Sequence, residues 1–200
     1  MFWGFLFFFD FRIQGFDILP DVIGYWLIYT GARDLILQSN HFNIVRKYAL
    51  PLIIVSLFDI YQVQTPIEQF TINPLVFLFI LVGFLITIID LILIYNLCFG
   101  IVEMALANDD FQLSSTAEFR WEYYLYVKIA MLIFTSIGFI ARHLIVIGFI
   151  PLFIISTGIL VLMMGLMKRA DQALILKACN RRRLRLNQLI DVKKNLFTVI

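Results

Sequence analysis

The stretch from Pro74 to Leu106 reads PLVFLFILVGFLITIIDLILIYNLCFGIVEMAL, and it contains two acidic residues, Asp90 and Glu103, but no basic residue. A run of about 20 predominantly apolar residues is enough to cross the roughly 30 Å hydrocarbon core of a bilayer. We therefore predict one transmembrane helix over the whole stretch. At a rise of about 1.5 Å per residue this helix is longer than the bilayer core is thick, so it should tilt or project into the cytoplasm.

The rest of the chain has the same apolar character. Of its 200 residues 62% are apolar and 15% are charged, and the mean hydropathy is +0.91, whereas soluble domains are about 45–50% apolar and about 25% charged. Residues 1–167 therefore predict an all-α, polytopic transmembrane helix bundle, and residues 168–200 a basic amphipathic cytoplasmic tail. The four other predicted spans are Ile18 to Ala32, Arg46 to Val63, Trp121 to Ala141 and Leu144 to Met167.

The N-terminal segment predicts an interfacial or re-entrant helix. Met1 to Phe9 is almost wholly apolar, but it lacks the positive start and small-residue cleavage site of a secretory signal, so we expect it to be retained. Pro20 disfavours helix at the residue before it and predicts a break there. Asp21 would then lie in the first turn of the next helix, near the positive end of the dipole. The alternative is that Asp17 and Asp21 form a cation or proton site.

The distribution of basic residues predicts the orientation. Nine of the sixteen Lys and Arg lie between Lys168 and Lys194. With five spans and the N-terminus outside, fourteen of the sixteen are on the inner side, as the excess of Lys and Arg in cytoplasmic loops requires. We therefore expect a multi-pass protein of the cell membrane with a cytoplasmic C-terminus.

The basic tail suggests partners of its own. Apolar residues interleave with the charges of Arg181 to Val192 in a helical pattern, as in a helix that lies on anionic lipid head groups. A protein partner would use the same charges. Nucleic acid is not expected, because no recognition module or aromatic interleaving accompanies them.

One motif resembles a known group of proteins. The string Asp17-Ile-Leu-Pro-Asp-Val-Ile-Gly-Tyr25, followed by an apolar helix and the Thr30-Gly-Ala turn, is similar to an uncharacterised family of small multi-span membrane proteins of Gram-positive bacteria. The resemblance covers about the first 60 residues. It implies a bacterial plasma membrane and supplies no activity or catalytic residue.

Polar residues inside predicted spans are the candidate binding residues. An ionised side chain near the bilayer centre costs about 2.5–3.5 kcal/mol and is a functional candidate by default. Asp90 is the strongest candidate, and we predict that it points into the bundle towards a polar partner from another span. The partners considered are Lys128, Asn96 of a neighbouring protomer, or the hydroxyl of Ser136 or Ser156.

The other candidates have simpler alternative roles. A small and polar stripe, formed by Asn96, Gly100, Glu103 and Ala107, permits close helix contact, and Glu103 is expected near the cytoplasmic edge. Lys128 could anchor at the interface through its long stem instead of pairing inward. Asp59 is expected near the outer end of its span. With Asp21, these residues complete the candidate intramembrane site.

No pattern predicts an enzyme. The sequence has no Gly-x-Ser-x-Gly, His-Glu-x-x-His or P-loop motif, and His41 and His143 fall on opposite sides of the predicted bundle. We expect no catalytic residue, metal or cofactor. Two hypotheses remain open: a small-solute or ion binding or transport component, and a non-catalytic accessory or sensory subunit that engages a partner through the tail. Either one is compatible with a homo-oligomer or a partner membrane subunit.

Overall fold

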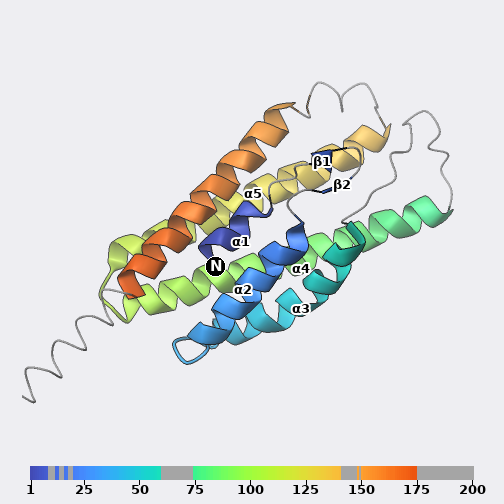
Figure 1. Cartoon of the computed structure of the whole chain (residues 1–200). Helices are drawn as coiled ribbons and strands as arrows, with labels where there is room; N and C mark the ends of the chain where they lie inside the picture. Colours follow the sequence, from blue (N-terminus) through green and yellow to red (C-terminus); the bar gives the residue numbers. More distant parts are fainter. Residues whose placement is uncertain are drawn as a thin grey trace, which may run out of the picture.

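The longest helix, α4 (Pro74–Leu106), packs against both α3 and α5 (Figure 1). The structure is a computed structural model that describes residues 1–8, 12–13, 16–17, 20–59, 74–140, 148 and 150–174. In chain order the other elements are α1 (Phe2–Leu6), β1 (Arg12–Ile13), β2 (Phe16–Asp17), α2 (Asp21–Leu35), α3 (His41–Asp59), α5 (Phe111–Ile140) and the helix Ile150–Leu174.

The fold is helical, as predicted, and the bounds of α4 agree with the sequence prediction. Three helical stretches among the described residues are long and apolar enough to cross a membrane, namely His41–Phe58, Leu81–Leu106 and Ile150–Leu174. This is fewer than the five predicted spans. Helix α2 has 15 residues, which is about 22 Å at 1.5 Å per residue. The described part of α5 is interrupted by charged residues, which include Glu118, Arg120 and Lys128.

The helices pack in the order in which they follow one another. Helix α2 packs against α3, α3 against α4, and α4 against α5. The buried core draws on α2, α3, α4, α5 and the helix Ile150–Leu174, with Ile28, Phe42, Leu97, Ala117 and Met163 fully buried. Large apolar side chains also cover much of the outer surface. In water such extended exposure would favour aggregation, whereas in a bilayer it is matched by the lipid.

The predicted break at Pro20 is confirmed. Helix α2 begins at Asp21, with Asp21 in its first turn and Pro20 in an extended conformation before it. The N-terminal segment folds back, so that α1 packs against α2. The approach is close: a Cβ atom on Gly4 would lie 2.9 Å from the carbonyl oxygen of Gly24. Only glycine at these positions allows the two backbones to lie this close.

A short antiparallel strand pair, which the sequence did not predict, lies between α1 and α2. Arg12 pairs with Asp17, and Ile13 pairs with Phe16. Because Asp17 belongs to a strand, it does not share a helical face with Asp21.

The reversal between α4 and α5 sets which residues of these helices meet. Asp109 adopts a positive φ of 57°, and the Asp110 carboxylate caps α5 by accepting a hydrogen bond from the backbone N–H of Leu113 at 3.0 Å. Asp90 lies sixteen residues before the end of α4, and Lys128 lies seventeen residues after the start of α5. The sharp turn therefore brings these two residues to the same level.

The predicted small and polar stripe of α4 lies against α3. Phe42 of α3 is fully buried on Gly100, where an added Cβ atom would lie 2.9 Å from the Phe42 Cζ atom. Gly83, on the same helix, has no atom within 4 Å of an added Cβ. The stripe therefore permits close helix contact at Gly100, as glycine does between membrane helices.

These two glycines give a first prediction. We expect Gly83→Ala to stabilise the protein, by up to about 1 kcal/mol, because alanine favours helix over glycine. Gly100→Ala should instead destabilise it by about 1 kcal/mol, because the buried Phe42 ring has little room to move. Thermal unfolding of the two variants in detergent, followed by circular dichroism, measures the difference. Equal shifts of the melting temperature in the same direction would contradict the close contact between Gly100 and Phe42.

Candidate functional site

Asp90 is the buried centre of a polar cluster built from three helices, in which Lys128 is partly exposed. It lies on α4 with a residual exposure of 5%, although it carries a carboxylate within one of the membrane-length helices. Its three partners are Tyr25 of α2 and Tyr124 and Lys128 of α5. Tyr124 and Lys128 are four residues apart, so they share one face of α5.

Both oxygens of the Asp90 carboxylate are engaged. The Lys128 Nζ atom lies 2.9 Å from Asp90 Oδ2, and the Tyr124 hydroxyl donates a hydrogen bond to the same oxygen at 2.6 Å. The Tyr25 hydroxyl donates a longer bond, of 3.4 Å, to Asp90 Oδ1. The Lys128 ammonium also lies 5.3 Å from the centre of the Tyr124 ring, within the range of a cation–π contact.

This arrangement balances charge in an apolar environment. A lone carboxylate in the bundle would lose its hydration without replacement, whereas here one ammonium and two phenol groups take the place of water. The predicted partner of Asp90 is therefore confirmed as Lys128, on the same chain. Within this chain Asn96 contacts His41, and the Ser136 hydroxyl donates to the Leu132 carbonyl of its own helix.

The two tyrosines were not predicted as site residues. Tyr124 follows Tyr123 and precedes Tyr126 in a cluster typical of the membrane interface, and Tyr126 is indeed 69% exposed. Tyr124 differs because it is buried, and the signal for this was its spacing of four residues from Lys128. Tyr25 had no comparable signal, since it lies 65 residues from Asp90 in the sequence.

Asp21 lies near this cluster. It precedes Tyr25 by one turn of α2, so the two residues share a face of that helix. The structure therefore brings three of the candidate residues, Asp21, Asp90 and Lys128, to one region.

Asn96 and Glu103 belong to a second cluster around His41. The His41 Nδ1 atom lies 2.9 Å from Asn96 Oδ1, and His41 Nε2 lies 3.9 Å from Glu103 Oε1. The Asn96 amide also donates to the Ile92 carbonyl at 2.7 Å. His41 is at the start of α3, so this cluster links α3 to α4, as the predicted role of Asn96 in helix packing requires.

For two other residues named in the sequence predictions, the structure does not describe the side chain. Asp59 is the last residue of α3, but its side chain lies outside the described residues, as does His143. Within the described ranges, no three His, Cys, Asp or Glu side chains are grouped so that they could hold a metal ion.

Comparison of the chain with protein-family models, with curated proteins and with solved structures finds no match.

Proposed function

We propose that this chain is a bacterial multi-pass membrane protein that binds or transports a small solute or ion, with Asp90 as its intramembrane acidic site. The observation that supports this most directly is the buried Asp90 carboxylate in contact with Lys128 and two tyrosine hydroxyls from neighbouring helices. Charged residues inside membrane helices are costly, and they commonly mark the path of an ion or a proton.

The arrangement of the helix ends supports a topology of five spans with a cytoplasmic C-terminus. The α2–α3 connection, the α4–α5 connection and the C-terminal end of the helix Ile150–Leu174 lie at the same end of the bundle (Figure 1). Arg33, Lys168 and Arg169 belong to the helix turns at that end. In this proposal α2 and α5 also cross the membrane. The resemblance of the Asp17 to Tyr25 motif supports a plasma membrane of Gram-positive bacteria.

The contact between Asp90 and Lys128 suggests how a site of this kind works. The Lys128 ammonium occupies the position beside Asp90 Oδ2 that a cationic ligand would take. A bound cation would replace Lys128, and a proton on Asp90 would remove the attraction between the two. In either case occupancy of the site is coupled to the contact between α4 and α5.

The alternative is an accessory or sensory subunit that engages a partner through its tail. The observation in its favour is that both Asp90 oxygens already have partners within the chain, as expected for a purely structural clamp between helices. In this alternative the polar cluster holds the bundle together, and the basic residues after Leu174 contact the partner or anionic lipid.

Ion flux through the purified chain in proteoliposomes tests the proposal. We expect an inward gradient of Na⁺, K⁺ or methylammonium to move protons, detected with an enclosed pH-sensitive dye, and Asp90→Asn to abolish the movement. Glu118→Gln is the matched control, because Glu118 is an exposed carboxylate on α5. Flux that persists in Asp90→Asn would exclude Asp90 as the site, and the absence of flux for all three cations in the wild-type chain would favour the accessory subunit.

A further inference from the structure

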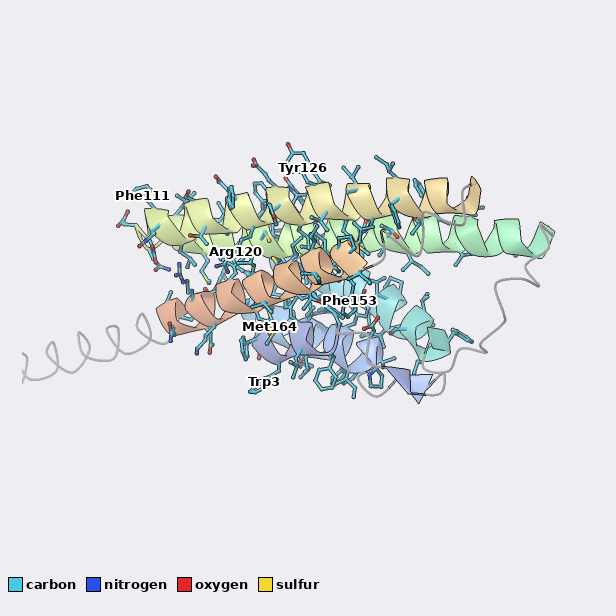
Figure 2. The ribbon with its side chains drawn as sticks, turned by 90° about the horizontal axis from the view of Figure 1, so that it is seen from above. Trp3, Phe111, Arg120, Tyr126, Phe153 and Met164 are labelled. Atoms are coloured by element: carbon cyan, nitrogen blue, oxygen red, sulfur yellow. The ribbon has the colours of Figure 1, made fainter. Side chains whose placement is uncertain are left out.

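A groove lies between α5 and the helix Ile150–Leu174, apart from the Asp90 cluster. Its volume is about 310 Å³, and its lining is mainly apolar. The lining residues are Thr116, Phe119, Arg120, Tyr123, Ile159, Leu162 and Met163. Figure 2 shows Arg120 between the two helices that form the groove.

Arg120 reaches across the groove. Its Nη1 atom donates a hydrogen bond to the backbone carbonyl of Leu162. The guanidinium has five N–H donors, so one such bond leaves most of them available. Within the described ranges, no Asp or Glu side chain forms an ion pair with Arg120.

A second arginine reinforces the positive charge. Arg169 follows Leu162 by two helical turns, so it lies on the same face of its helix. The Arg120 guanidinium lies against Gly165, where an added Cβ atom would be 3.5 Å from Nη1, and Arg169 follows Gly165 by about one turn. Two neighbouring guanidinium groups, neither of them in an ion pair with an acidic side chain of the described residues, form a candidate site for an anion. Their planar donors fit a phosphate group especially well.

The remaining walls of the groove fit a hydrocarbon chain. Phe119 and Tyr123 have exposed rings on α5, stacked with their centroids 6.3 Å apart, while Ile159 and Met163 are buried at the base. The exposed Ile155, one turn before Ile159, continues the apolar wall away from the arginines. One end of the groove is therefore positively charged, and its walls are apolar along the rest of its length.

We propose that this groove binds an anionic phospholipid, with its phosphate between Arg120 and Arg169 and one acyl chain along Phe119, Tyr123 and Ile159. Basic pockets between membrane helices on the cytoplasmic side are suited to such head groups. Lys168 and Arg169 end the apolar part of the helix, so the phosphate lies at a surface of the bilayer. The lipid site requires only that the chain is in a membrane, and it does not depend on the proposed role of Asp90.

Native mass spectrometry of the full chain in detergent tests this site with phosphatidylglycerol as the probe. We expect Arg120→Gln/Arg169→Gln to weaken binding of phosphatidylglycerol by about tenfold, which corresponds to about 1.4 kcal/mol. Arg33→Gln/Lys47→Gln is the control, because it removes two exposed basic side chains at the same end of the bundle and should leave binding within about twofold of wild type.

A second variant tests the apolar part of the groove. Leu162→Trp places a larger ring in the groove while keeping both arginines, and we expect it to weaken phosphatidylglycerol binding too. This variant remains informative if removal of the arginines prevents folding. Equal binding of phosphatidylcholine and phosphatidylglycerol would overturn the proposal. Displacement of the lipid by millimolar inorganic phosphate would also overturn it, because that result would identify a site for the free anion. An equal loss of phosphatidylglycerol binding in the control pair would overturn it as well.

Discussion

Replacement of Lys128 by methionine is expected to lower the free energy of unfolding by about 3 kcal/mol, because it leaves the buried Asp90 carboxylate without its counter-charge. Methionine is similar in length to lysine and keeps the apolar contacts of the stem, so the change isolates the ammonium group. The two tyrosine hydroxyls remain on Asp90 in this variant. They limit the loss of stability to the lower part of the range for broken buried ion pairs.

The double variant Lys128→Met/Asp90→Asn provides the control. An amide needs no counter-charge, and its oxygen still accepts a hydrogen bond from Tyr124, so most of the lost stability should return. A double-mutant cycle from equilibrium unfolding in mixed detergent micelles measures this coupling. Strictly additive effects of the two substitutions would contradict an ion pair that contributes to the folded bundle.

The second large effect is expected at Tyr124. Its hydroxyl donates a short bond of 2.6 Å to Asp90, and hydrogen bonds to charged groups contribute about 1.5–3 kcal/mol. Tyr124→Phe should therefore destabilise the protein by about 2 kcal/mol, while the ring remains in the core.

Tyr25→Phe is the matched comparison. The Tyr25 hydroxyl lies 3.4 Å from Asp90, a distance at which hydrogen bonds are weak, so we expect a loss of about 0.5 kcal/mol. Thermal unfolding of the two variants shows which substitution destabilises the protein more. A larger effect from Tyr25→Phe would mean that α2, rather than α5, holds the carboxylate.

Several features of the fold could be predicted because their signals are local. The bounds of α4 follow from a long, predominantly apolar run, the start of α2 follows from Pro20, and the close contact at Gly100 follows from a stripe of small and polar residues. The pairing of Asp90 with Lys128 could also be inferred, because an uncompensated carboxylate in a membrane helix requires a partner and few basic residues were available.

Other features depend on packing between distant parts of the chain. Tyr25 and His41 reach α4 only because the α2–α3 hairpin packs against it, and their partners are 65 and 55 residues away in the sequence. Tyrosine near a predicted membrane surface is usually an interfacial anchor. Its use as a buried hydrogen-bond donor was therefore not apparent from the sequence.

The positions of Tyr124 and Lys128 on α5 have a consequence for motion. The two side chains are one turn apart on a single face, and both contact Oδ2 of Asp90. A helix turns by about 100° per residue, so a rotation of α5 about its own axis that withdraws one of them withdraws the other as well. A rotation of α5 therefore acts on the hydrogen bond and the ion pair at the same time.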